Sequence, residues 1–221
     1  MENALIIGSS GGIGAALSDA LIARGVAVTG LSRSGDGLDV TDETSVKAAL
    51  GALTGPFDLV FVATGALAID GAEPEKTLRH VTADAMLDQF KLNAVGPSLV
   101  LKHAIRLLPR TGRSIFAALS ARVGSIGDNG LGGWYSYRTS KAALNQMIHS
   151  GAIELARTHK DLTCVALHPG TVETKFTEKY VANHATVPAP EAAENLLTVL
   201  DGLTAQDTGK FFDWQGKEVP W

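Results

Sequence analysis

The sequence predicts an α/β fold with a parallel, doubly wound sheet and helices on both faces, a three-layer sandwich. Short, nearly continuous apolar runs alternate with longer segments in which apolar residues recur every three or four positions. A glycine-rich stretch, GSSGGIG, follows the first of these runs. The 221 residues are 45% hydrophobic and 19% charged, which is typical of a globular protein with a sizeable core.

The apolar runs are expected to be strands, because parallel strands covered on both faces are apolar along their whole length. In order they are ALIIG (4–8), AVTGLS (27–32), DLVFVATG (58–65), RSIFAALS (113–120), LTCVALH (162–168) and a last strand in GKFFDW (209–214). The periodic segments between them predict helices over 13–24, 44–53, 85–108, 136–159 and 190–203. Right-handed crossovers between such units give a parallel sheet. No repeat or linker divides the chain, so one domain over 1–221 is expected.

Composition argues against several classes of protein. The formal net charge is −4 and no basic stripe stands out, so no nucleic-acid partner is expected. The first residues do not resemble a signal peptide, and no run approaches 18 apolar residues, so we expect a cytoplasmic protein without membrane contact. The single cysteine, Cys164, lies in an apolar run and is expected to be a buried structural thiol. The six histidines show no metal-ligand spacing, so no metal site is expected.

The glycine-rich stretch lies between the first strand and the first helix, where a dinucleotide-binding turn would lie. Gly8 allows a tight turn, Gly12 lets the backbone approach a pyrophosphate, and Gly14 permits close helix–strand packing, with Ser10 and Ile13 in the same stretch. The helix dipole and the free N–H groups would hold the phosphates. The alternative is an ordinary glycine-rich turn.

The choice of cofactor is expected to depend on the end of the second strand. An acid there would bind a ribose 2′-OH, but the chain offers Ser32, Arg33 and Ser34 and has no acid until Asp36. Hydroxyls and a guanidinium suit a 2′-phosphate. NADP(H) is therefore predicted over NAD(H). The alternative is that Arg33 is an ordinary surface residue.

Several short motifs occur in a fixed order along nearly the whole chain. They are GSSGGIG (8–14), LDV (38–40), ATGA (63–66), Asn93 in KLNAVG, YRTSK (137–141) and HPGTVET (168–174). With these motifs the sequence resembles the short-chain dehydrogenase/reductase family. The stretches VGSIGDNGLGGWYSYRTSKAALN (123–145) and FFDWQGKEVPW (211–221) are similar to its C-factor-like proteins and sniffer-type carbonyl reductases.

The resemblance implies a Rossmann-type fold with a sheet of about seven strands, and a homodimer or homotetramer. It also implies NAD(P)-dependent interconversion of carbonyls and alcohols in a small-molecule substrate. It assigns cofactor contacts to Asp39, Val40, Ala63, Thr64 and Gly65. Because signalling is also found in this subgroup, the alternative is a nucleotide-binding signalling or sensor protein with weak or no turnover. A third alternative, a scaffold with a vestigial site, would bind no cofactor.

Tyr137 and Lys141 are four residues apart and therefore share one face of a helix, which Tyr135 does not. Reduction of a carbonyl needs a proton donor at the oxygen. Lowering the pKa of tyrosine from about 10 to near 7 takes about 4 kcal/mol, and a nearby ammonium acts in that direction. Tyr137 is thus the expected acid, and Lys141 is expected to lower its pKa and to hold the nicotinamide ribose.

Two further catalytic residues follow from the resemblance. Asn93 is expected to hold a water that links Lys141 to solvent; the alternative is a polar residue on an exposed turn. The family places a substrate-orienting serine second in a serine pair, where this chain has Ala121 after Ser120. We expect Ser120, in a shifted register, to orient the substrate carbonyl. The alternatives are that Ser125 supplies the hydroxyl, or that Tyr137 alone polarises the substrate.

The HPGTVET motif follows the strand expected over 162–168, at the carboxyl edge of the sheet where such folds bind ligands. All four of its predicted cofactor residues lie there: Pro169 and Gly170 are expected to turn the chain, and Val172 and Thr174 to contact the nicotinamide. The next stretch, KFTEKYVANHATVPAP (175–190), lacks strong periodicity and is expected to be a lid over the substrate. Together these features predict an NADP(H)-dependent carbonyl reductase.

Overall fold

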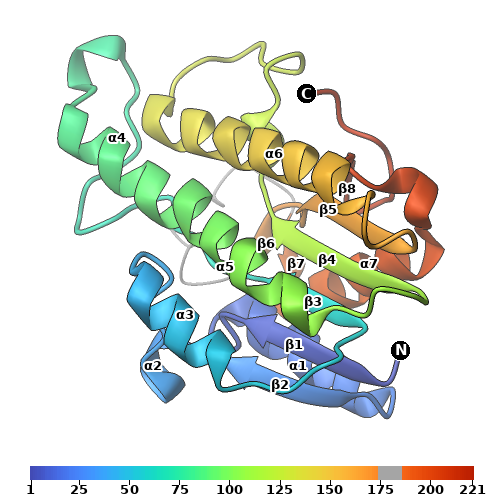
Figure 1. Cartoon of the computed structure of the whole chain (residues 1–221). Coiled ribbons are helices and arrows are strands. Elements are labelled where there is room, and N and C mark those ends of the chain that lie inside the picture. The colour runs from blue at the N-terminus through green and yellow to red at the C-terminus, as the bar shows by residue number, and fades with distance from the viewer. Residues whose placement is uncertain (174–185) are drawn as a thin grey trace.

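The computed structural model describes residues 1–173 and 186–221. Its main sheet has six parallel strands among these residues, in the order β2-β1-β3-β4-β5-β8 (Figure 1). The strands are β1 (Asn3–Ile7), β2 (Ala27–Leu31), β3 (Leu59–Val62), β4 (Ser114–Leu119), β5 (Leu162–His168) and β8 (Phe211–Asp213). All six lie in runs from which strands were predicted, and the doubly wound α/β class is confirmed.

The expected count of about seven strands is too high for the described residues. After β2 the chain forms a short helix, α2 (Arg33–Asp36), and then runs through LDV (38–40) without pairing to the sheet. The N–H of Leu38 donates to the carbonyl of Ser32, and that of Asp39 donates to the Ser45 hydroxyl. Because these backbone donors are bound within local turns, β2 remains the edge of the sheet.

Two helical layers cover the sheet. One contains α1 (Gly12–Ala23) and α7 (Ala189–Gly202); the other contains α3 (Glu43–Gly51), α4 (Ala83–Phe90), α5 (Gly96–Ala104) and α6 (Tyr135–Leu155) (Figure 1). Alternate strand residues face opposite layers. In β1, Leu5 and Ile7 belong to the core on the α5 and α6 side, whereas Ala4 and Ile6 belong to the core on the α1 and α7 side.

The helix expected over 85–108 is present without a gap, but it is not α-helical throughout. Between α4 and α5 the backbone forms a π-helical turn over Lys91–Val95, and a 3-10 turn over Ile105–Leu107 follows α5. A π turn inserts an extra residue into the helix and is frequently found at functional sites. Other single 3-10 turns occupy Leu78–His80, Arg122–Gly124 and Ala205–Asp207. A pair of two-residue strands, β6 (Val172–Glu173) and β7 (Val187–Pro188), was not predicted.

The sheet contains a point at which its winding reverses, between β1 and β3. From β1 the chain first adds β2 on one side and then returns to add β3 on the other. Open α/β sheets bind ligands outside the carboxyl ends of the strands at such a point.

Cys164 is fully buried in β5, as expected. In the described part of the chain, no helix combines the length and the apolar character needed to cross a bilayer.

Candidate active site

The glycine turn brings α1 very close to β1. Gly8 ends the strand with a φ of 88°, and a Cβ atom there would lie 3.1 Å from the carbonyl carbon of Ala63. A Cβ on Gly14 would lie 2.2 Å from the carbonyl oxygen of Gly8, which no side chain could tolerate. Gly12 and Ile13 form the start of α1, and Gly12 is exposed. The N-terminus of α1 therefore lies directly beside the turn.

A cleft of about 600 Å³ lies at the carboxyl ends of β1, β2 and β3. That volume is in the range of ligand sites. Most of the predicted cofactor residues line it: Gly8, Ser10, Ser32, Arg33, Ser34, Asp39, Val40, Ala63, Thr64 and Gly65. Asp70, Asp88 and Lys91 also line it and were not predicted. Thr64 contributes a buried hydroxyl that has no hydrogen-bond partner within the described residues.

The three residues after β2 have different roles in the wall of this cleft. Ser32 is buried; its hydroxyl caps α2 by accepting from the N–H of Gly35 at 3.0 Å. Ser34 donates its hydroxyl to that of Ser10 at 3.0 Å, which connects α2 to the glycine turn. Arg33 is exposed on the cleft. Arg33 therefore supplies the positive charge at this end of the cleft.

Asp39 also lines the cleft and is held as an anion there. Its carboxylate accepts from the hydroxyl of Thr41 at 2.7 Å and from its N–H at 2.8 Å, and these bonds lower the pKa of Asp39. The charges of Lys91 and Arg33 lower it further. Next to it, Val40 is buried. The bonds to Thr41 thus keep a negative charge in a cleft that Arg33 and Lys91 also line.

Tyr137 and Lys141 lie together in the first turns of α6 and are both buried. The Lys141 ammonium donates to the carbonyl of Leu119 at the end of β4, at 2.8 Å, and lies 5.9 Å from the centre of the Tyr137 ring. A Cβ on Gly65 would lie 3.2 Å from Nζ of Lys141. Because Gly65 also lines the cleft, the pair is adjacent to the end of the predicted cofactor site.

Burial changes the proton affinity of both groups. It raises the pKa of Tyr137 and lowers the pKa of Lys141 to about 7. Desolvation disfavours the charged form of each side chain, which explains the opposite signs. The shift of Tyr137 is thus opposite in direction to the acidification by Lys141 that the sequence predicts for the reaction, and that acidification stays a prediction.

Asn93 is fully buried in the π-helical turn, so the alternative of an exposed turn is wrong. Its side-chain oxygen accepts from the N–H of Ala66 at 3.0 Å, and its amide donates to the carbonyl of Ala66 at 2.9 Å. The amide also donates to Gln89 Oε1 at 2.5 Å. A Cβ on Gly65 would lie 2.9 Å from Asn93 Oδ1. Asn93 and Lys141 thus both pack against Gly65.

The Ser120 hydroxyl points into the protein. Ser120 is buried after β4, and its hydroxyl donates to Oδ1 of Asn145 at 2.6 Å. Asn145 follows Lys141 by one helical turn and shares its face of α6. In the described part of the chain, its buried amide nitrogen has no hydrogen-bond partner. The proton of Ser120 is thus engaged in this bond.

Ser125 has a different set of contacts. Its hydroxyl donates to the carbonyl of Pro220 at 2.5 Å and accepts from the N–H of Asp128 at 3.0 Å. The neighbouring N–H of Gly127 donates to the carbonyl of Trp221. Ser125 therefore fastens the loop after β4 to the last residues of the chain.

The HPGTVET motif lies beyond the carboxyl end of β5. Gly170 has a φ of 79°, and a Cβ there would lie 3.0 Å from Cδ1 of Trp214, so Pro169 and Gly170 turn against the residue that follows β8. Val172 is buried in β6 and pairs with Val187 of β7. Thr174 and most of the predicted lid (175–190) lie outside the described residues.

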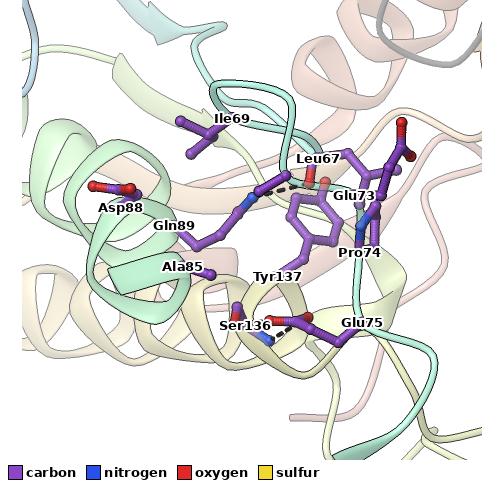
Figure 2. A pocket seen from close by; sticks show the side chains of 11 residues that line it. Leu67, Ile69, Glu73, Pro74, Glu75, Ala85, Asp88, Gln89, Ser136 and Tyr137 are labelled. Carbon is purple, nitrogen blue, oxygen red and sulfur yellow. Dashed lines mark hydrogen bonds between the residues drawn. The ribbon is translucent and has the colours of Figure 1, made fainter. Parts of the chain in front are cut away.

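A small pocket of about 20 Å³ lies against Tyr137, and Figure 2 shows its lining. Gln89 extends from α4 and donates to the carbonyl of Leu67 at 2.9 Å. Glu75 lies next to Ser136 at the start of α6. Neither Glu75 nor Gln89 was predicted to belong to the site. The sequence signal for Glu75 was indirect: Trp134, the residue just before α6, has no side-chain oxygen to cap the helix.

Comparison with known proteins gives a consistent result. Residues 2–185 match the family model described as short chain dehydrogenase. C-signal from Myxococcus xanthus is 36% identical over 168 residues, which cover 76% of this chain and 95% of that protein. The 1-hydroxy-2-glutathionyl-2-methyl-3-butene dehydrogenase of Rhodococcus sp. (strain AD45) is 30% identical over the whole of both chains.

A solved structure supports the same relationship. A Burkholderia multivorans protein described as a short-chain dehydrogenase/reductase, with bound NADP, has a TM-score of 0.81 and 27% identity. The alignment covers 100% of this chain and 99% of that one.

Proposed function

Because the chain belongs to the short-chain dehydrogenase/reductase family, we propose that it is an NADP(H)-dependent oxidoreductase that interconverts a carbonyl and an alcohol. One observation carries the proposal. Gly65 lines the cleft and would, with a Cβ atom, lie 3.2 Å from Nζ of Lys141, beside the buried Tyr137. A proton donor and an ammonium therefore lie at the end of a cleft of dinucleotide size.

The cleft residues suit NADP(H). The backbone of the glycine turn and the start of α1 would hold the diphosphate, and Arg33 would bind the 2′-phosphate. The buried hydroxyl of Thr64 has no hydrogen-bond partner within the described residues. A bound ligand could supply that partner. When bound, the cofactor supplies a hydride to the carbonyl carbon. The NADP bound in the Burkholderia multivorans structure supports the proposal that this chain also binds the cofactor.

In this mechanism Tyr137 donates its proton to the substrate oxygen as the carbonyl is reduced. The phenol of Tyr137 is protonated at neutral pH and can act as an acid, although burial raises its pKa and so opposes loss of the proton. Lys141 holds the nicotinamide ribose and, when charged, stabilises the tyrosinate that forms. Asn93 fixes the backbone at Ala66 beside Gly65, and we assign it the water of the proton relay.

Ser120 is the proposed carbonyl-orienting residue, and its bond to Asn145 sets a condition on that role. With Asn145 Oδ1 as acceptor, the proton of Ser120 points away from a substrate. Rotation of the Asn145 amide by half a turn would let its nitrogen donate to Ser120 instead. The hydroxyl proton of Ser120 would then be free to bind a carbonyl oxygen.

The experiment that tests the proposal is NADPH oxidation with a panel of small aldehydes and ketones. The wild-type protein should turn over at least one class, and Tyr137→Phe should lose activity by roughly 10²-fold or more because the general acid is absent. Tyr135→Phe is the matched control and should retain activity. Activity that survives in Tyr137→Phe would refute this mechanism.

A second function, a nucleotide-binding signalling or sensor protein with weak or no turnover, is favoured by the loop after β4. There Ala121 has no hydroxyl, and the hydroxyls of Ser120 and Ser125 are bonded to Asn145 and Pro220. This function predicts tight NADPH binding in calorimetry together with no turnover across the panel.

A small carbonyl or alcohol is the proposed substrate. A homodimer or homotetramer and a cytoplasmic location remain predictions. Light scattering of the purified protein and localisation of the protein in cells would test them.

A further inference from the structure

The helix that carries Tyr137 and Lys141 begins without a local cap. The residue before its first turn is Trp134, which adopts a left-handed conformation with a φ of 51°. An indole ring cannot accept hydrogen bonds from the free N–H groups of a helix start. Ordinarily a serine, threonine, aspartate or asparagine at this position does so. The first turn of α6, in which Tyr137 lies, therefore needs acceptors from elsewhere.

Glu75 supplies these acceptors from a segment 61 residues away in the sequence (Figure 2). Its carboxylate accepts from the N–H of Ser136 at 3.2 Å and also from the Ser136 hydroxyl. Its backbone carbonyl accepts from the N–H of Trp134 at 2.6 Å. Glu75 is only 6% exposed and Ser136 only 2%, so water cannot easily replace these bonds.

We propose that Glu75 is a positioning residue for the reaction: it caps α6 from outside the helix and thereby fixes the phenol of Tyr137. The proposal rests on the proposed function, because it concerns the acid of that reaction. A carboxylate is favourable at the positive end of a helix dipole. Tyr137 directly follows Ser136, so loss of the cap would loosen the turn that orients its ring. Pro74 and Glu75 also line the pocket against that ring.

Two substitutions of Glu75 distinguish the loss of its hydrogen bonds to Ser136 from the loss of its negative charge. Glu75→Gln keeps both bonds to Ser136, because the amide oxygen can accept from the N–H and the amide nitrogen can donate to the hydroxyl. Glu75→Ala removes both. Lys76→Ala, which changes the next, exposed residue of the same loop, is the matched control.

The kinetic experiment measures NADPH oxidation by these variants. Glu75→Ala should lower kcat by roughly 10- to 100-fold, because displacement of a catalytic group by about 1 Å has effects of that size. The Kd for NADPH should be unchanged, since Glu75 is not part of the cofactor cleft. Glu75→Gln should keep kcat within about threefold of the wild type, because the net worth of a hydrogen bond is modest and both bonds are retained. Lys76→Ala should match the wild type.

Hydrogen exchange of peptides that cover 134–138 provides a readout without turnover. Glu75→Ala should speed exchange of the Ser136 amide but not of the Trp134 amide, whose acceptor is the backbone carbonyl of residue 75, and Glu75→Gln should protect Ser136 as the wild type does. Wild-type exchange and wild-type kcat in Glu75→Ala would overturn the proposal. A Glu75→Gln variant that lost kcat but kept protection would overturn it too, in favour of a role for the charge. A wild-type protein without turnover would refute the proposed function, and exchange would still decide whether Glu75 caps the helix.

Discussion

The proposed selectivity for NADP(H) rests on one exposed guanidinium, that of Arg33. Arg33 lines the cleft, whereas the hydroxyls of Ser32 and Ser34 already bind Gly35 and Ser10. Arg33→Ala should weaken NADPH binding by about 10- to 100-fold and leave NADH binding nearly unchanged, since a hydrogen bond to a charged group is worth roughly 1.5–3 kcal/mol. Fluorescence titration with each cofactor measures both Kd values.

The control for that variant is Arg79→Ala, which removes an exposed arginine outside the cleft lining. It should bind both cofactors as the wild type does. An Arg33→Ala protein that lost NADH and NADPH affinity equally would show that Arg33 does not read the 2′-phosphate.

The two serines after β4 should differ in what their loss affects. Ser120→Ala should lower kcat/KM by roughly 10²-fold, the cost typical of removing a hydrogen-bond donor to a substrate oxygen. Ser125→Ala should chiefly lower Tm, because its hydroxyl connects Pro220 to Asp128. Steady-state kinetics and thermal unfolding of both variants measure the difference. Full kcat/KM in Ser120→Ala, with a large loss in Ser125→Ala, would transfer the orienting role to Ser125.

At the level of elements, the strands were the most predictable part of the chain. Their apolar runs are long enough to be recognised, because both faces of the sheet are covered. In the stretch 85–108 the apolar periodicity predicted the helix but not the π turn within it. Its apolar spacing continues through Lys91–Val95, where a π turn shifts the helical register and Asn93 is fully buried. Local spacing cannot reveal that shift, because it depends on packing against Gly65 and Ala66.

The residues of the candidate site also divide into those that the sequence could predict and those that it could not. Tyr137 and Lys141 could be found from sequence because their relationship is a helical spacing. Glu75 and Gln89 could not, because they reach Tyr137 from segments that precede α6 by many residues. The bonds of Ser120 and Ser125 were equally hidden, since their partners Asn145 and Pro220 are distant in sequence. Contacts made by folding, rather than residue types, define this part of the site.

For the molecule as a whole, Lys141 makes stability depend on pH. Its pKa falls from the usual value to about 7 in the fold, so the folded state binds fewer protons than the unfolded state above that pH. The contribution of Lys141 to the unfolding free energy should therefore rise with pH from near 7 towards the unfolded lysine value of about 10.4, by up to roughly 1.4 kcal/mol per pH unit. Below pH 7 the full cost of burying the ammonium remains.

Lys141→Met should remove this slope, because a thioether of similar length carries no proton. Urea unfolding of both proteins at several pH values measures it. The variant should be the more stable protein at pH 6, and its advantage should shrink as pH rises. Parallel pH profiles for the two proteins would contradict a depressed pKa for Lys141.

The order of the strands has a consequence for how the chain acquires its structure. Every neighbour in the sheet comes from a remote part of the sequence: Asn3 pairs with Ala27, Ala4 with Leu59, and Ala166 with Phe211. Contacts of this kind make folding slow, since large loops must close before any pairing is formed. The outermost strand beside β5 is β8, at residues 211–213. During synthesis on the ribosome the sheet therefore remains open along β5 until residues 211–213 have emerged.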